Sequence, residues 1–116
     1  MVFWYPKEEP VTTLKADTFP AFIEKHDRVF VHFAAAWNGY DRMFIPHVVN
    51  AARQLVDKIH FAAIDIDVKE NFNLCVEHRV SNVPFIAIYE SGKLIESGAG
   101  YDYGMKRLAL LTTKLH

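Results

Sequence analysis

The sequence predicts a single α/β domain in which a mixed β-sheet is covered by helices on both faces. Apolar runs typical of strands buried on both sides alternate along the chain with segments of helical periodicity. The last two strand-like runs are separated only by Ser91-Gly92, a two-residue hairpin turn, so this pair must be antiparallel. The chain has 116 residues, of which 51% are hydrophobic, and this is enough for one packed core.

The first third of the chain predicts an arm, two strands and a helix between them. Residues 1–10 combine aromatic and charged side chains with two prolines, and we expect an extended arm there. A short strand is expected at residues 11–14, followed by a helix at about residues 18–26. Pro20 is tolerated in this helix because it falls within the first turn. The continuous apolar run at residues 29–34 predicts a buried strand.

A long helix is predicted after a turn at residues 37–42. Pro46 lies early in it and should kink it, because proline has no N–H to donate to the helical ladder. The apolar residues recur at the spacing of an amphipathic helix. They are Ile45, Val48, Val49, Ala52, Leu55, Val56 and Ile59.

The second half of the chain predicts three more strands and two helices. Buried strands are expected at residues 61–66 and 85–89, the hairpin partner at 93–97, and a break or bulge at 98–100. The helix between the first two strands should bury an apolar face made of Phe72, Cys75, Val76 and Val80. The closing helix should bury Met105, Leu108, Leu111 and Leu115.

The predicted order of elements is therefore β-α-β-α-β-α-β-β-α. Two strands joined through a helix are normally parallel, with a right-handed crossover. A sheet of this kind usually places its functional site where a central strand ends and a helix begins. Here that point is residues 37–42.

The charge balance argues against several classes of partner. Lys plus Arg number 13 and Asp plus Glu number 14, so the formal net charge is −1. A nucleic-acid binder would carry a basic stripe, and a polybasic membrane anchor would need a cluster of lysines and arginines. No apolar run is long enough to cross a bilayer, and the N-terminus is not a secretory signal as it stands. We therefore expect no nucleic-acid or membrane partner and a cytoplasmic location.

The single cysteine, Cys75, excludes an intramolecular disulfide and a CxxC redox pair. Its spacing to His78 supplies at most two metal ligands, too few for a closed zinc site. No other motif indicates a metal or a cofactor, and we expect neither. Cys75 should behave as a small buried hydrophobic residue, because the helical periodicity directs it inward.

The order and spacing of several short motifs together resemble the thioredoxin family. Trp37-Asn38-Gly39-Tyr40-Asp41-Arg42 occupies the place of the family's Trp-Cys-Gly-Pro-Cys-Lys motif, and Pro46 matches the kinking proline of the following helix. Val83-Pro84 matches the dipeptide whose proline is cis in the family. The resemblance implies the thioredoxin fold for residues 11–116, which form the expected thioredoxin-like domain after the arm.

The chain departs from the family at the chemical positions. Asn38 stands at the attacking position and Asp41 at the resolving position, so both cysteines of the motif are missing. Thiol–disulfide exchange needs a thiolate to attack sulfur and a second thiol to resolve the mixed disulfide. We therefore expect a redox-inactive domain with no catalytic residues in the degenerate motif.

His32 and Asp41 form the most informative pair in this resemblance. In thioredoxin, the position of His32 holds a buried acid that lies beneath the resolving cysteine. We expect the imidazolium and the carboxylate to favour each other's charged forms. The pair is either an acid–base dyad or a structural pair that replaced a redox pair, and we favour the structural interpretation.

The resemblance also implies a binding surface around the former active site, where the family grips an extended substrate segment with the cis-proline backbone. The residues expected there are Trp37, Tyr40, Val83, Pro84, Phe85 and Ala99. An exposed aromatic patch usually marks a binding surface. Alternatively, Phe85, Tyr40 and the arm pack on one another.

Two functions remain open from the sequence. The first is a protein- or peptide-binding module of adaptor or chaperone type, whose target is an extended peptide, a folded partner or a second copy of the chain. The alternative is an enzyme that uses His32 and Asp41 in proton transfer, or one that uses a bound external thiol such as glutathione.

Overall fold

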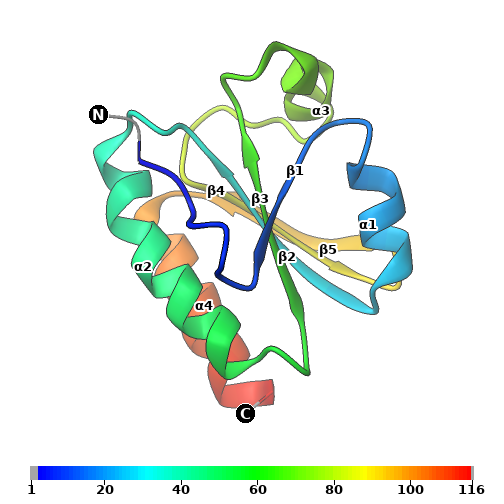
Figure 1. Ribbon diagram of the computed structural model, residues 1–116, viewed down its shortest axis with the longest axis vertical. Helices are drawn as coiled ribbons and strands as arrows, with labels where there is room; N and C mark the ends of the chain where they lie inside the picture. Colours follow the sequence, from blue (N-terminus) through cyan, green and yellow to red (C-terminus); the bar gives the residue numbers. More distant parts are fainter. Residues whose placement is uncertain (1–2, 116) are drawn as a thin grey trace.

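The computed structural model describes residues 3–115 and confirms the predicted order of elements (Figure 1). A 3₁₀ turn, η1, is an addition that the sequence did not predict. The elements are β1 (Val11–Leu14), α1 (Phe19–Lys25), β2 (Arg28–Ala34), α2 (Gly39–Gln54), β3 (His60–Asp65), η1 (Lys69–Asn71), α3 (Phe72–Glu77), β4 (Phe85–Glu90), β5 (Lys93–Ala99) and α4 (Tyr101–Leu115).

The five strands form one mixed sheet in the order β1-β3-β2-β4-β5. β3 runs parallel to both β1 and β2, whereas β4 is antiparallel to β2 and to β5. Every residue of β2 except Arg28 is buried, as expected for a central strand covered on both faces. The carboxyl end of β2 therefore leads from the middle of the sheet into α2.

Helices cover the two faces of the sheet in pairs. One core cluster joins residues of α2 and α4 to Phe30 and Ile86. The other joins residues of α1 and α3 to Val31 and Phe33. Figure 1 shows the same arrangement, with α2 and α4 side by side and α1 and α3 on the other side of the sheet. Among the described residues, no helix is both long and apolar enough to cross a membrane.

The long helix ends earlier than its apolar period predicts. α2 stops at Gln54, Leu55 is its buried C-cap, and Ile59 is buried in the connection to β3. Val56 is 53% exposed, so its inclusion in the buried face was wrong. The helical spacing of apolar residues continues beyond Gln54 because the connection to β3 also packs apolar residues, Leu55 and Ile59, into the core.

The expected inner face of α3 was also wrong. Phe72 and Val76 are exposed, and Leu74 is the buried residue of this helix. Asn71 sets the geometry, because its side-chain amide donates to the Asp65 carbonyl and its Oδ1 accepts from the Ala16 N–H. These bonds fix the 3₁₀ turn that precedes α3, and a helix of six residues then buries only one narrow side.

The irregularity of the β4–β5 hairpin lies at a different place from the one predicted. Gly98 and Ala99 pair regularly with β4, so residues 98–99 are strand and not a break. Ile88 faces Glu96 and Tyr89 faces Leu94, which leaves Ile95 as the extra residue of a bulge. A bulge in an edge strand hinders pairing with another sheet.

The arm contributes to the core. Residues 3–10 contain no helix or strand, and Met1 and Val2 lie outside the described residues. Tyr5 is 6% exposed, and Phe3 and Trp4 pack against the cluster beneath α2. The Trp4 indole donates to Thr13 Oγ1 at 2.9 Å. The arm therefore lies against the domain.

The packing of α4 on α2 gives a first prediction. A Cβ atom at Gly104 would lie 2.7 Å from the ring of Phe44, which is fully buried and has no room to retreat. Gly104→Ala should lower the free energy of unfolding by about 1–3 kcal/mol in urea denaturation. Gly39→Ala is the control, because nothing lies within 4 Å of its Cβ position. Equal stability of the two variants would contradict the close approach.

Candidate functional site

The candidate site lies where β2 ends, α2 begins and the loop before β4 approaches. Asn38 is the N-cap of α2, and its Oδ1 accepts from the Tyr40 N–H at 3.0 Å. Its Nδ2 donates to the Val83 carbonyl at 3.2 Å. The residue at the family's attacking position thus joins the helix to the loop through an amide.

The two aromatic residues of the degenerate motif are exposed. Trp37 is 68% exposed and Tyr40 is 61% exposed. The Trp37 indole donates to Asp67 Oδ2 at 2.7 Å, which holds it over the loop that follows β3. Tyr40 contacts the ring of Tyr101 from α4, with ring centroids 6.4 Å apart.

Asp41, by contrast, is buried beneath the motif. It is the third residue of α2 and is only 1% exposed. Its Oδ1 lies 2.8 Å from His32 Nε2, and its Oδ2 accepts from the Ala35 N–H at 3.0 Å. The predicted contact between His32 and Asp41 is confirmed. A carboxylate in the first turn of a helix is also favoured by the helix dipole.

Tyr5 completes this network, and the sequence did not reveal it. Its hydroxyl lies 2.8 Å from His32 Nδ1. Burial raises the pKa of Tyr5 well above its usual value, and the charge of Asp41 raises it further, so the phenol keeps its proton. The hydroxyl therefore donates to Nδ1, and Nε2–H donates to Asp41. Every polar atom of the network is satisfied with a neutral imidazole.

The pKa of His32 is shifted in the opposite direction to the one expected. Burial lowers the pKa of His32, and its hydrogen bond and charge interaction with Asp41 only partly oppose this effect. This direction is opposite to the expected one, because desolvation outweighs attraction at a fully buried position, and it favours the neutral imidazole. His32 and Asp41 are exposed by 0% and 1%, which leaves no path for a substrate to either group.

A groove opens next to this network, on the surface. Its volume is about 510 Å³. Four of the expected surface residues line it, namely Tyr40, Val83, Pro84 and Ala99. The peptide bond between Val83 and Pro84 is cis, as the resemblance implied. The Gly100 N–H donates to the Pro84 carbonyl at 2.8 Å and ties the loop to the start of α4.

Phe85 does not belong to this surface. It is 6% exposed and packs edge-on against Phe33, in the layer of α1 and α3. The alternative, in which Phe85 packs against Tyr40, is also wrong, since the aromatic neighbour of Tyr40 is Tyr101. In a strand that is apolar throughout, the sequence does not show which residues face which layer.

The groove also contains residues that the sequence did not single out. Tyr101, Asp102 and Tyr103 of α4 line it, together with Gly100 and with Asn82 of the loop before β4. The signal that pointed to this region was the Gly98-Ala99-Gly100 segment, which we assigned to a break in the chain. Trp37 is exposed nearby but does not line the groove.

Cys75 is half-buried on α3, packed against the core beneath α1 and α3. Burial raises the pKa of its thiol, and the charge of Asp65 raises it further. His78 is engaged elsewhere, because Nδ1 bonds the Leu74 carbonyl and Nε2 bonds the Tyr89 hydroxyl. Within residues 3–115, no group of three or more His, Cys, Asp or Glu side chains could hold a metal ion.

Comparisons with known proteins agree with this geometry. The family model "Thioredoxin" matches residues 10–110. Protein disulfide-isomerase from Saccharomyces cerevisiae is 34% identical over 104 residues, which are 90% of this chain and 19% of the relative. Protein disulfide-isomerase from Arthroderma benhamiae is 34% identical over 100 residues, which are 86% of this chain and 18% of the relative. The chain thus spans about a fifth of the length of these relatives.

Solved structures share the fold at lower sequence identity. Thioredoxin f2 from Chlamydomonas reinhardtii has a TM-score of 0.79 and 22% identity, covering 90% of this chain and 95% of that one. Mitochondrial thioredoxin 3 from Saccharomyces cerevisiae has a TM-score of 0.75 and 24% identity, covering 90% and 92%. These similarities establish the architecture.

The buried network predicts a large effect of removing its central residue. His32→Ala should lower the free energy of unfolding by about 3–5 kcal/mol, because it leaves a buried carboxylate without its donor. Tyr5→Phe should cost about 1–3 kcal/mol, because it leaves Nδ1 unsatisfied. His47→Ala is the control at an exposed position of α2. Urea denaturation measures all three, and an unchanged midpoint for His32→Ala would refute the pairing.

The lowered pKa of His32 also predicts a pH dependence. In the unfolded chain the imidazole has its ordinary pKa of about 6.5, so below that pH the unfolded state binds a proton more readily than the folded state does. The contribution of this group is therefore full above about pH 6.5 and is lost as the pH falls below it. His32→Gln keeps a donor for Asp41 but does not titrate.

The free energy of unfolding should therefore fall more between pH 7.5 and pH 5.5 in the natural chain than in His32→Gln. The other titrating groups are the same in both proteins and cancel in the comparison. Identical slopes would show that folding does not lower the pKa of His32, and a natural chain that gains stability on acidification relative to the variant would show that folding raises it.

Proposed function

The chain belongs to the thioredoxin family, and we propose that it is a redox-inactive member that binds extended protein chains, as an adaptor or chaperone-like module. The observation that carries the proposal is the open groove formed by Tyr40, the cis Val83–Pro84 loop and Ala99. It lies beside a motif that has no sulfur. The cis-proline loop and the groove beside it are present, whereas both cysteines of the family's motif are missing.

Loss of redox activity follows from the chemistry at positions 38 and 41. Neither an amide nor a carboxylate can attack a disulfide sulfur and form a mixed disulfide. Both side chains also have other tasks, since Asn38 caps α2 and Asp41 belongs to the buried network. Cys75 is no substitute, because burial raises its pKa and so favours the unreactive thiol.

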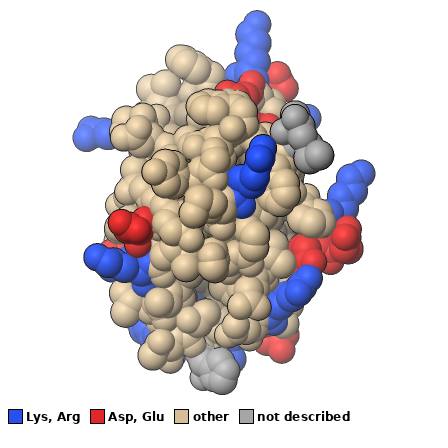
Figure 2. Space-filling model, turned by 90° about the vertical axis from the view of Figure 1, so that its left-hand side faces the viewer, with Lys and Arg blue, Asp and Glu red and all other residues tan. Residues whose placement is uncertain are grey.

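The groove suits a chain with apolar or aromatic side chains. Tyr40, Tyr101 and Tyr103 supply large rings with polar tips, which are common anchors in protein interfaces. Figure 2 views the molecule from the side on which α2 lies, and the charged side chains on this face lie mostly toward its edges, apart from one basic side chain near the middle. The relatives with the name protein disulfide-isomerase act on protein disulfides, and this supports a protein chain as the bound partner here.

The enzymatic alternative has weaker support. Proton transfer by His32 and Asp41 requires a substrate to reach them, but both side chains are enclosed. An external thiol such as glutathione would have to dock in the same groove and supply all the sulfur chemistry itself. Binding of a protein chain needs no such addition.

The proposal predicts binding of an unfolded chain that carries no free thiol. The probe is reduced and carboxymethylated α-lactalbumin, and the measurement is its dissociation constant by fluorescence anisotropy. Ala99→Arg and Tyr40→Ala should each raise the Kd by about tenfold or more, because they block the groove or remove an aromatic anchor.

Leu94→Arg is the matched control, since it places the same charge at an exposed position of the same strand, outside the groove. It should leave the Kd unchanged. The proposal fails if the natural chain does not bind the probe, or if Ala99→Arg and Leu94→Arg weaken binding equally.

A further inference from the structure

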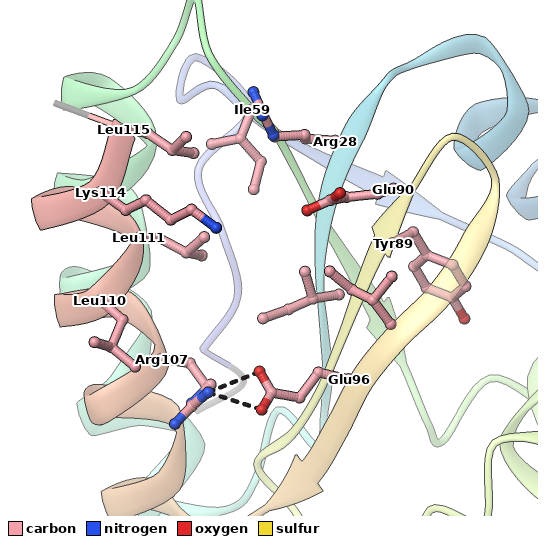
Figure 3. A pocket seen from close by; sticks show the side chains of 12 residues that line it. Arg28, Ile59, Tyr89, Glu90, Glu96, Arg107, Leu110, Leu111, Lys114 and Leu115 are labelled. Atoms are coloured by element: carbon pink, nitrogen blue, oxygen red, sulfur yellow. Dashed lines mark hydrogen bonds and ion pairs between the residues drawn. The ribbon is translucent and has the colours of Figure 1, made fainter.

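A second hollow lies at the opposite end of the sheet from the groove, between the β4–β5 hairpin and α4 (Figure 3). It adjoins Arg28 at the start of β2 and Glu90 at the end of β4, whereas the groove adjoins the end of β2. Its volume is about 250 Å³. None of its lining residues lines the groove, so the hollow is a separate feature.

The walls of the hollow are apolar. Ile59 and Ile88 form a buried floor, and Leu111 of α4 is half-buried beside them. Ile95 and Leu110 form the lip and are 53% and 54% exposed. Ile95 is the bulged residue of β5, and it faces the hollow while exposed to solvent. A molecule seated here would cover apolar side chains that water now reaches.

Charged groups lie at both ends of the hollow, and they are paired with each other at only one end. At one end, Arg107 Nη1 donates to both carboxylate oxygens of Glu96, at 2.7 and 2.8 Å. At the other end are Arg28 and Lys114, and Figure 3 shows Lys114 extending from α4 into the hollow. Within residues 3–115, neither cation forms an ion pair, nor does Glu90, which faces Arg28 across the strands. The end that carries Arg28, Lys114 and Glu90 therefore has a net charge of +1.

Arg107 adds a polar feature within the hollow. Its Nε is buried and has no hydrogen-bond partner among the described residues. A buried donor without a partner is uncommon in folded proteins. This donor belongs to the end of the hollow that Glu96 closes, and it lies apart from Arg28 and Lys114.

We propose that this hollow binds a small amphipathic monocarboxylate, with its apolar body between Ile88, Ile95 and Leu111 and its carboxylate between Arg28 and Lys114. Among the described residues the two cations form no ion pair, and a single carboxylate complements them. Glu90 disfavours a second negative charge. The volume lies just below the range of roughly 300–1,000 Å³ typical of ligand pockets, which favours a body of one alkyl chain or one ring. This proposal is independent of the function proposed for the groove.

The test is a titration of the isotope-labelled protein with decanoate, followed by backbone amide NMR shifts. The largest shifts should occur at Ile88, Ile95 and Leu111. Decylamine, which has the same chain with a positive head, should bind at least about tenfold more weakly. Shifts centred on the groove, or equal binding of the two amphiphiles, would overturn the proposal.

Two pairs of variants test separately the contribution of the positive charge and that of the apolar cavity to binding. Lys114→Glu should raise the Kd for decanoate by about tenfold or more, whereas Lys106→Glu, exposed on α4 outside the hollow, should not. Ile95→Trp should fill the hollow and abolish binding, whereas Leu94→Trp should not. Equal effects within either pair would overturn the proposed site, and the amide spectra show whether each variant remains folded.

Discussion

A buried carboxylate is the constraint on which the rest of this structure depends. Asp41 is 1% exposed and lies in the first turn of α2. Burying a charge is costly unless it is paired and hydrogen-bonded. Three parts of the chain meet this demand: Ala35, directly after β2, donates its backbone N–H, β2 supplies His32, and the arm supplies Tyr5 to hold the imidazole.

This network places the two polar residues that stand at the cysteine positions in fixed structural contacts. In thioredoxin, the same position carries the resolving cysteine, whose thiol must become reachable during exchange. Here the Asp41 carboxylate at that position accepts hydrogen bonds from His32 and from the Ala35 N–H, and Tyr5 of the arm holds the imidazole of His32. Asn38 is fixed in the same way, between the helix it caps and the Val83 carbonyl. Asp41 and Asn38 thus connect α2 to β2 and to the proline loop, and the groove lies open beside them.

The sequence predicted those features that repeat or that match a motif. The order of elements, the cis proline and the pairing of His32 with Asp41 all followed from periodicity or from the resemblance. Tyr5 was missed because an arm without periodicity carries no signal for a contact 27 residues away. Phe72 and Val76 were misplaced because a six-residue helix is too short for its period to define a face. The bulge at Ile95 depends on strand register, which sequence pattern alone does not specify in a two-sided strand.

We propose that this protein retains the thioredoxin architecture without disulfide chemistry. The most direct measurement is the dithiothreitol-dependent reduction of insulin, followed by turbidity beside an active thioredoxin. The account predicts a rate equal to the background of dithiothreitol alone at every protein concentration. A rate that rises in proportion to the concentration of this protein would contradict it.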